Sequence, residues 1–335
     1  MIEIDGSEGG GQVVRSAVAL AVLCDESVRI EGIRGDRPNP GLHYQHLAAI
    51  EALQTIANLE VEGAELGAEV LTVEPGAIRG GQFEVDIGTA GSVTLVADAV
   101  LPLAARLSEP LSVTIRGGTD VEWSPPVDAH RLGKLPLLRR CGWALALDCV
   151  RRGFYPAGGG AVRLQLAPCD PAPLVLSERG SVARIAIRSV ATPDLAGADV
   201  ARRQADAAAE AVREAGYDVD RTVVETATAD ATGSAVVLRA ACDPGVVCGD
   251  ALGEPGRPAE DVGEAAAAEL IEALDGPGAV DPRLADQLLV PLAVAGGELL
   301  LPTETDHVRS GLALLEAFDL DVTVERTGDG ILVRA

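Results

Sequence analysis

Lysine and aromatic residues are scarce in this sequence. Lys134 is the only lysine among 335 residues, and aromatic residues make up 2% of the chain. Hydrophobic residues make up 47%, so the chain can bury a core, and that core must consist of Ala, Val, Leu and Ile. Lys134 lies in RLGKLPLL, which has a helical pattern and is not the motif of a ligase with a lysine nucleophile. The sequence therefore argues against covalent catalysis through a lysine.

Long hydrophobic segments and paired cysteines are also absent. No apolar run reaches the roughly 18 residues that a membrane helix needs, and the N-terminal MIEIDG lacks the regions of a signal peptide. The six cysteines form no CxxC pair, which favours free thiols in a reducing cytoplasm. Cys242 and Cys248 are spaced like metal ligands, but no second pair accompanies them. We therefore expect a cytoplasmic protein that does not cross a membrane.

Charge is strongly biased to one sign, with a formal net charge of −24. An acidic excess with almost no lysine is typical of a halophile's cytoplasm, where carboxylates hydrate the surface and salt screens their repulsion. Taken alone, the charge argues against a nucleic-acid partner. If the protein works in concentrated salt, the acidic charge is an adaptation to that habitat and says nothing of the ligand. RNA binding would then need local arginine clusters, because counterion release contributes little.

The hydrophobic pattern repeats along the chain. Residues 2–74 follow the order β-α-β-α-β-β, and residues 83–166 repeat it, with IRGG at 115–118 matching IRGD at 33–36. A third copy begins with a short strand at 174–176 and resumes at 285. The predicted helices of the two complete units span 11–24, 43–57, 92–106 and 128–140.

The interruption of the third copy has its own pattern. It contains predicted strands at 183–188, 222–226 and 235–239 and predicted helices at 199–215 and 262–274. We therefore predict an α+β fold in which a large domain of three repeated βαβαββ-like units, residues 1–181 and 280–335, carries a smaller inserted α+β domain, residues 182–279.

Two glycine triplets stand next to predicted secondary structure. Gly9, Gly10 and Gly11 lie between a strand and a helix, where backbone N–H groups and the helix dipole favour an anion. The second triplet, Gly158–Gly160, precedes a strand in RGFYPAGGGAV. Glycine permits positive φ and close approach of a ligand or another strand. A phosphate-binding loop and a tight turn are both consistent with these triplets, as with Gly88–Ser92, the counterpart of the first triplet in the second unit.

Arginines and histidines gather in a few loops. Arg34 and Arg37 lie in the stiff loop IRGDRPNPG, which suits either a phosphate or ion pairs in a solvated loop. His43 and His46 are three residues apart at a helix start, without a nearby carboxylate to complete a metal site. His307 opens the last predicted helix. Neutral imidazole is the best nucleophile in this chain besides cysteine, although a structural role is open to each histidine.

Several motifs together resemble the RNA 3′-terminal phosphate cyclase family. They are DGSEGGGQVVRSA (5–17), IRGDRPNPGLHYQHL (33–47), GGTDVEWSPPVD (117–128), RGFYPAGGGAV (152–162) and LADQLLVPLAVAGG (284–297). The similarity extends over almost the whole chain, and several motifs in the same order are far more specific than one glycine-rich loop. The family's fold, three repeated units with an inserted α+β domain, agrees with the fold that the periodicity predicts.

The resemblance implies an ATP-dependent ligase that acts on RNA with a 3′-terminal phosphate. An active-site histidine, which matches His307, would accept AMP from ATP and pass it to the RNA 3′-phosphate, giving RNA-3′-pp-5′-A. The vicinal 2′-OH would then close a 2′,3′-cyclic phosphate and expel AMP. Glu8 matches an acidic residue of the family and is the candidate ligand for Mg²⁺ or Mn²⁺. A homodimer is left open.

The resemblance also implies a nucleotide-binding set. Pro125 and Pro126 would border the adenine, and Asp286 could bond adenine or ribose. Arg283 stands where the family often has an aromatic residue, so a guanidinium would stack there instead. Asp98 stands where relatives carry glutamine. The full set implied around ATP is Glu8, Gly9, Gly10, Gln12, Arg34, Arg37, His46, Pro125, Pro126, Gly158, Gly159, Arg283, Asp286 and Gln287.

Two other interpretations stay open at the level of sequence. A non-catalytic RNA-processing scaffold of the same fold would lack the histidine that His307 supplies. A sugar-phosphate enolpyruvyl transferase has similar repeated units, but its chemistry binds anionic substrates through lysines, and this chain has only Lys134. His307 and the scarcity of lysine therefore favour the cyclase interpretation.

Overall fold

The structure is a computed structural model that describes residues 1–328 and 330–335. Its first unit contains β1 (Ile2–Asp5), α1 (Gly11–Cys24), β2 (Val28–Glu31), α2 (Tyr44–Ala57), β3 (Glu60–Glu62) and β4 (Leu71–Glu74). The strands form a sheet in the order β1-β2-β4-β3, in which β1 and β2 are parallel and the other pairs are antiparallel. Apolar residues at helical spacing bury one face of each helix against this sheet and its neighbours.

The second unit repeats this topology with some irregular helices. It contains β5 (Gly81–Asp86), α3 (Val93–Val100), η1 (Leu101–Arg106), β6 (Leu111–Gly117), α4 (Val127–Ala129), η2 (His130–Lys134), α5 (Leu135–Arg140), β7 (Leu145–Arg151) and β8 (Gly160–Leu166). The helix predicted at 92–106 changes to 3₁₀ geometry at Leu101, where Pro102 lacks a backbone N–H. The helix predicted at 128–140 contains a π-helical segment, η2.

The third unit is assembled from two distant parts of the chain. It contains β9 (Leu174–Leu176), α8 (Pro282–Gln287), α9 (Leu289–Ala295), β14 (Gly297–Leu301), α10 (Asp306–Ala317), β15 (Thr323–Thr327) and β16 (Gly330–Arg334). Gly297 of β14 pairs in parallel with Leu174 of β9, and the order β9-β14-β16-β15 matches the other two units. The predicted α+β fold with three repeated units is therefore confirmed.

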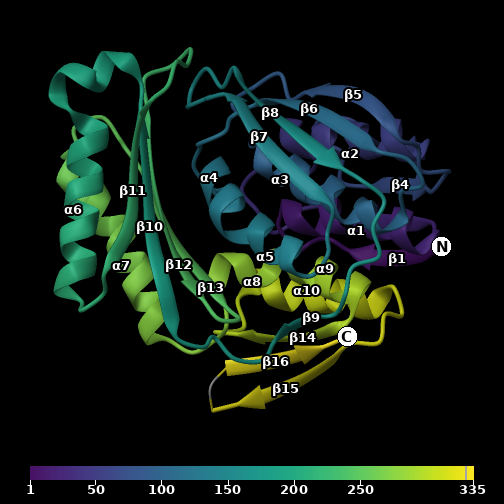
Figure 1. The fold of residues 1–335 in the computed structure, drawn as a ribbon. Coiled ribbons are helices and arrows are strands. Elements are labelled where there is room, and N and C mark those ends of the chain that lie inside the picture. Colours follow the sequence, from purple (N-terminus) through teal and green to yellow (C-terminus); the bar gives the residue numbers. More distant parts are fainter. Residues whose placement is uncertain (329) are drawn as a thin grey trace.

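The chain between β9 and α8 forms a fourth sheet with its own core (Figure 1). It contains β10 (Val182–Ala191), η3 (Pro193–Ala198), α6 (Val200–Glu214), β11 (Val219–Thr226), β12 (Ser234–Cys242), β13 (Val246–Leu252) and α7 (Ala259–Asp275), with the strand order β11-β10-β12-β13. We call residues 182–279 the insert and the remainder the large domain; these exact limits stay a prediction. β13 was not predicted, because Gly249 and Asp250 interrupt its apolar pattern.

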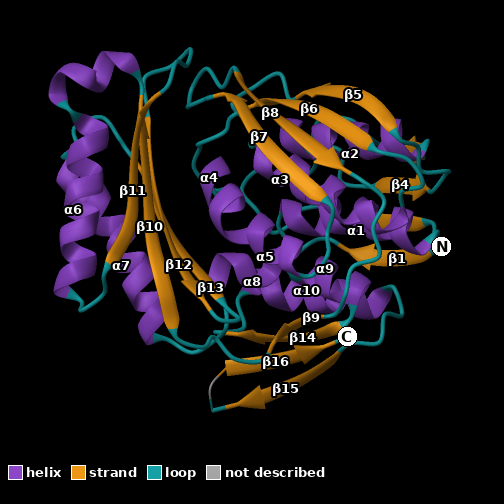
Figure 2. Ribbon diagram, in the orientation of Figure 1, coloured by secondary structure: helices purple, strands orange, loops and turns teal. Residues whose placement is uncertain are grey.

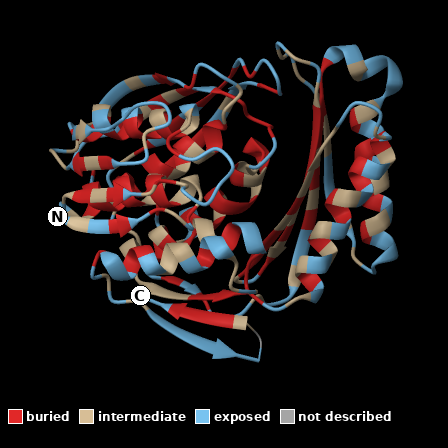
Figure 3. Ribbon diagram, turned by 180° about the vertical axis from the view of Figure 1, so that it is seen from behind, coloured by how far each residue is buried: buried red, intermediate tan, exposed pale blue. Residues whose placement is uncertain are grey.

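Helices lie inside the large domain and the sheets lie around them (Figure 2). The core is almost wholly aliphatic, as the composition predicts, and Figure 3 shows its buried residues on the inward faces of helices and strands. In the insert, α6 and α7 cover one face of the sheet. No helix in residues 1–328 or 330–335 is long and apolar enough to cross a membrane.

A buried ion-pair network joins the insert to the large domain. Arg152, from the stretch before β8, binds both carboxylate oxygens of Asp120 at 3.1 Å and also pairs with Asp128. Asp128 in turn lies 3.2 Å from Arg188 Nε of β10, and Arg188 pairs with Glu225 of β11. Removing one member of such a buried network leaves an uncompensated charge. Arg152, the first residue of RGFYPAGGG, therefore helps to hold the insert against the large domain through this ion-pair network.

The two ends of the insert are also held together. The Arg179 Nη1 atom, just before β10, donates to the carbonyl oxygens of Ala273 at 2.9 Å and Gly276 at 2.8 Å, at the end of α7. Val246 forms a bridge with Val280. The chain thus leaves the large domain and returns to it at neighbouring points.

Candidate active site

A cleft of about 1290 Å³ lies between the large domain and the insert. Its walls come from the start of α1, the loops before α2 and α4, α8, the start of α10, and on the insert side from β13 and α7. The cleft brings together most of the residues that the sequence predicts around ATP: Gly10, Gln12, Arg34, Arg37, His46, Pro125, Arg283, Asp286, Gln287 and His307.

The N-terminus of α1 opens into this cleft. Gly10 is its N-cap residue and provides no side-chain hydrogen bond, so the first N–H groups of the helix are free to bind an anion. A Cβ on Gly10 would lie 3.7 Å from Nε2 of His307, and one on Gly11 would lie 1.9 Å from Nε2 of His46. Two imidazoles approach this turn: at Gly11 only glycine leaves room for His46, whereas a methyl group on Gly10 would make an ordinary van der Waals contact with His307.

His307 lines the cleft and is the predicted nucleophile. It lies in the first turn of α10, whose N-cap Thr305 accepts a hydrogen bond from the N–H of Val308. Burial lowers the pKa of His307, and the nearby cations Arg15 and Arg37 lower it further. The Nδ1 atom lies 3.8 Å from a carboxylate oxygen of Asp286, whereas Nε2 faces Gly10. The imidazole is therefore neutral near pH 7, with Nε2 directed at the start of α1.

Asp286 lies on the Nδ1 side of the His307 imidazole. Burial raises the pKa of its carboxyl to about 7, with Lys134 opposing the shift and Asp98 adding to it. Asp286 therefore changes its charge in the range where many phosphoryl-transfer enzymes work. In its ionised form, 3.8 Å from Nδ1 of His307, it is too far for a hydrogen bond but close enough to stabilise an imidazolium electrostatically.

His46 has a different role from His307. The backbone N–H of His43 donates to His46 Nδ1 at 3.0 Å, so the proton of the neutral ring is on Nε2. Burial lowers the pKa of His46 to about 3, with help from Arg15 and Arg34. His46 is a buried, neutral hydrogen-bond donor that faces Gly11, with no free lone pair directed at the cleft.

Three arginines, Arg15, Arg34 and Arg37, line the large-domain side of the cleft. Arg34 is held by the carbonyl oxygen of Gly41 at 3.2 Å and by Nε2 of His43. The side chains of Arg15 and Arg37 make no hydrogen bond or ion pair within the described residues. Burial lowers the pKa of Arg15 to about 10, and the carboxylates of Asp98 and Asp286 oppose this shift only in part. Arg15 is a phosphate-binding candidate that the sequence reasoning missed, although it follows Gly11 by one helical turn.

Asp98 pairs with two buried titratable groups, His130 and Lys134, to which the motifs assign no role. Its Oδ1 atom lies 2.7 Å from both Nε2 of His130 and Nζ of Lys134. Burial would raise the pKa of Asp98, but these two groups hold it well below its usual range. The single lysine of the chain is therefore a buried counter-charge at the base of the cleft, outside any nucleophilic role.

Arg283 links the cleft to the insert. Its Nη1 atom lies 2.6 Å from Asp250 and its Nη2 atom 2.6 Å from Glu269. Burial, with Asp250 next to it, raises the pKa of Glu269 to about 7. The edge of the guanidinium is taken up by these two carboxylates, so only its planar face is open to an adenine ring.

Five of the predicted residues do not line the cleft. Glu8 is exposed on the loop before α1, Gly9 packs against Val13, and Pro126 begins α4 beside Pro125. Gly158 and Gly159 both have positive φ and lie against other parts of the protein. A Cβ on Gly158 would be 2.8 Å from the Cα atom of Ala90, and one on Gly159 would be 2.2 Å from Asp230 of the insert.

The loop at Gly88–Ser92 is likewise occupied by protein. The backbone of Gly158 packs on it, and Ser92 serves as the N-cap of α3. Within residues 1–328 and 330–335, no three His, Cys, Asp or Glu side chains are grouped to hold a metal, and Cys242 and Cys248 belong to no such group.

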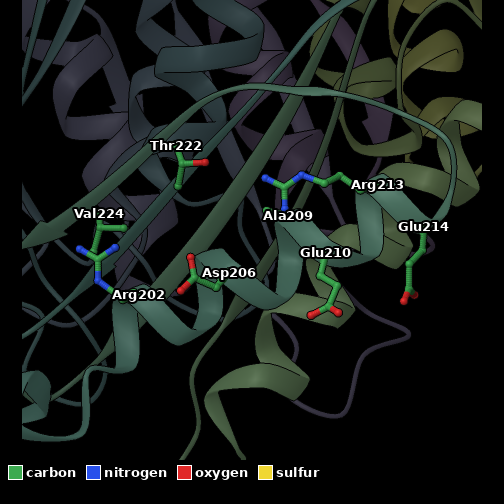
Figure 4. Close-up of a pocket in the computed structure, with 8 residues that line it drawn as sticks. All are labelled: Arg202, Asp206, Ala209, Glu210, Arg213, Glu214, Thr222 and Val224. Atoms are coloured by element: carbon green, nitrogen blue, oxygen red, sulfur yellow. The ribbon is translucent and has the colours of Figure 1, made fainter.

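A second pocket lies on the insert, between α6 and β11 (Figure 4). Its volume is about 760 Å³, and its lining mixes both signs of charge on an exposed helix face: Arg202, Asp206, Glu210, Arg213 and Glu214. It contains neither a histidine nor any of the predicted site residues. The histidine and most of the predicted site residues lie instead in the cleft between the large domain and the insert.

A helix N-terminus, three arginines that form no ion pair within the described residues and a neutral histidine lie together in this cleft, an arrangement suited to a phosphorylated ligand. The family model described as RNA 3′-terminal phosphate cyclase matches residues 6–325. The chain is 44% identical over 341 residues to the RNA 3′-terminal phosphate cyclase of Halobacterium salinarum, with 98% of each chain covered. It is 43% identical to that of Methanopyrus kandleri, covering 98% of this chain and 96% of the relative. The protein belongs to the RNA 3′-terminal phosphate cyclase family.

Proposed function

We propose that the protein uses ATP to convert an RNA 3′-terminal phosphate into a 2′,3′-cyclic phosphate, with AMP carried covalently by His307. The position of His307 is the observation that carries this proposal. Its Nε2 atom faces the N-terminus of α1, 3.7 Å from the place of a Cβ on Gly10. A phosphate bound by the first N–H groups of α1 would lie directly in front of that nitrogen.

In the first step, the Nε2 lone pair of His307 attacks the α-phosphorus of ATP. An N–P bond forms, the bond from the α-phosphorus to the bridging oxygen breaks, and pyrophosphate leaves. The Nδ1–H remains directed at Asp286, whose carboxylate stabilises the imidazolium that results. The lowered pKa of His307 supports this step, because it keeps Nε2 unprotonated near pH 7.

In the second step, an oxygen of the RNA 3′-phosphate attacks the phosphorus of AMP, and neutral imidazole leaves. The vicinal 2′-OH then attacks the activated 3′-phosphate, releasing AMP and a proton and closing the ring. Arg15, Arg34 and Arg37 would offset the negative charge of the phosphates in both steps. Splitting one difficult transfer into steps with a good leaving group is the advantage of the covalent route.

Mg²⁺ or Mn²⁺ would neutralise charge on the ATP phosphates. Glu8, on the loop before α1, is the protein ligand that we propose, with Gln12 nearby on the first turn. Mg²⁺ commonly takes one or two carboxylates together with phosphate oxygens and waters. The lack of a three-residue cluster among the described residues agrees with such an open site.

The test is covalent labelling with α-labelled ATP and Mg²⁺ in concentrated salt, followed by denaturation. We expect an acid-labile label on the wild-type protein and none on His307→Ala. The matched control is His43→Ala, which removes another imidazole of the same cleft. Absence of label on folded wild-type protein would favour the non-catalytic scaffold, and label that survives in His307→Ala would mean that another residue is the nucleophile.

A further inference from the structure

Trp123 is the most exposed large apolar side chain of the described residues. Its relative exposure is 95%, whereas the other tryptophan, Trp143, is 2% exposed in the core. Trp123 lines the cleft, on the loop between Val121 and Pro125. In a chain with so few aromatics, leaving an indole in water forgoes the free energy that its burial would give. Such exposure is understandable if a ligand covers the ring.

The backbone holds this side chain outward. Trp123 has φ of 64°, in the left-handed region that bulky residues rarely adopt. The loop is fixed on both sides: Ser124 Oγ donates to the carbonyl oxygen of Val121 at 3.1 Å, and Thr94 Oγ1 donates to that of Pro125 at 3.0 Å. The surrounding structure therefore imposes a conformation that a tryptophan would not choose alone, which is common at ligand-binding sites.

Trp123 is set apart from some of the residues implied to surround the base of ATP. Pro125, Arg283 and Gln287 also line a small recess of about 20 Å³, and Trp123 is not among the residues that line it. Trp123 contributes to the wider part of the cleft, together with Glu122. A second base, beyond the nucleotide, would meet the indole there.

We propose that Trp123 is a stacking platform for the terminal nucleobase of an RNA 3′ end whose phosphate enters the cleft. The inference rests on the proposed function, because it requires an RNA end next to His307. Stacking on an aromatic ring serves all four bases and so accepts ends of any sequence. It also needs no positive surface, which suits a chain with a net charge of −24.

The two tryptophans make the proposal directly measurable by fluorescence. Trp143 should emit as a buried indole and Trp123 as a solvated one, so a base stacked on Trp123 should quench the red side of the spectrum. We would titrate the full-length protein with a short RNA ending in a 3′-phosphate, with the same RNA carrying an abasic terminal nucleotide, and with ATP alone. Quenching by the first ligand only is the expected result.

Affinity gives a second readout. Loss of one base–aromatic stack should raise the Kd for the RNA by about 5-fold to 150-fold in Trp123→Ala, and Trp123→Phe should restore most of the binding. The control is Tyr155→Ala, which removes an aromatic that is 75% exposed outside the cleft. Equal affinity of the abasic RNA, unchanged binding by Trp123→Ala, or quenching by ATP alone would each overturn the proposal.

The outcome can be separated from that of the proposed function. Labelling of the wild-type protein by α-labelled ATP requires no RNA. A protein that labels but shows no RNA-dependent quenching contradicts only the role of Trp123. A folded protein that does not label contradicts the enzyme itself.

Discussion

The two glycine triplets have nearly the same composition but contact different partners. The first, at Gly9–Gly11, ends at the N-terminus of α1 and faces two imidazoles across the cleft. The second, at Gly158–Gly160, adopts positive φ at its first two residues and packs against Ala90 and Asp230. The first triplet borders the cleft, whereas the second packs against the protein's own backbone at Ala90 and the side chain of Asp230. Glycine content alone does not distinguish these uses; the neighbouring element does.

The largest difference between the triplets should appear with Gly10→Ala. The backbone of Gly10 is in the extended region, which alanine tolerates, so stability should fall by no more than about 1 kcal/mol. The new methyl group would point at Nε2 of His307 and displace the α-phosphate, reducing the labelling rate on the order of 100-fold. Single-turnover labelling measures the effect. A rate equal to that of the wild type would place the phosphate elsewhere.

Gly158→Ala should give the opposite pattern. Alanine at φ of +65° is strained, and its Cβ would lie 2.8 Å from backbone of the second unit, so unfolding free energy should drop by about 2 kcal/mol. Denaturant unfolding at constant salt measures this loss. Labelling per folded molecule should stay near that of the wild type. A selective loss of labelling without loss of stability would show that this triplet also contacts a ligand.

A pH series tests the surroundings of the first triplet. Since the pKa of Asp286 is about 7, the labelling rate should rise through that pH as the carboxylate forms behind His307. We expect a change of about tenfold, modest because 3.8 Å exceeds a hydrogen-bond distance. Asp286→Asn should flatten the profile, whereas Glu269→Gln, which removes the other carboxyl with a pKa of about 7, should keep the step. A step that follows Glu269 would contradict the assignment.

The same titration affects stability with a definite sign. Burial raises the pKa of Asp286 in the folded protein above its ordinary value of 3.8. The folded state therefore holds the proton more tightly, and the contribution of Asp286 to stability is fully present below the unfolded pKa. It declines as pH rises through about 7. Unfolding free energies of wild type and Asp286→Asn should accordingly converge at low pH and diverge in favour of the variant above pH 7.

The smallest effect is expected at the exposed partner of the second triplet. Asp230 forms an ion pair with Arg151 at 2.5 Å, but both side chains are about half exposed. Such pairs contribute between about 0 and 1 kcal/mol. Asp230→Asn should therefore change the unfolding free energy by less than about 1 kcal/mol, in a measurement paired with Gly158→Ala. A larger loss would mean that the insert depends on this contact for its position.

Local patterns predicted most of the fold, because strands and helices of this protein follow the 2-residue and 3.6-residue periods of half-buried elements. The prediction failed where those periods are disturbed. β13 was missed because Gly249 and Asp250 break its apolar run, and Gly249 is needed since a Cβ there would lie 2.4 Å from the carbonyl oxygen of Ala266. The helix predicted at 92–106 keeps its position but changes geometry at Pro102.

The site was predicted less evenly. His307, Asp286 and Arg34 were identified through motifs, and the structure brings them to one cleft. Arg15 and Trp123 were not singled out, because the reasons to consider them depend on their surroundings: burial without an ion pair for Arg15, and an exposed side chain on a strained backbone for Trp123. Long-range contacts of this kind leave no period in the sequence. The placement of Gly158 against Ala90 is another example.

The discontinuous third unit has a consequence for synthesis of the chain. During translation, β9 emerges well before β14, and its edge stays unpaired until the whole insert has followed. Closing that long loop directly is entropically unfavourable. The contacts of Arg179 with Ala273 and Gly276 bring the two ends of the insert together. We therefore expect the insert to fold first on the ribosome, so that its completion brings residues 280–335 next to the unpaired edge of β9.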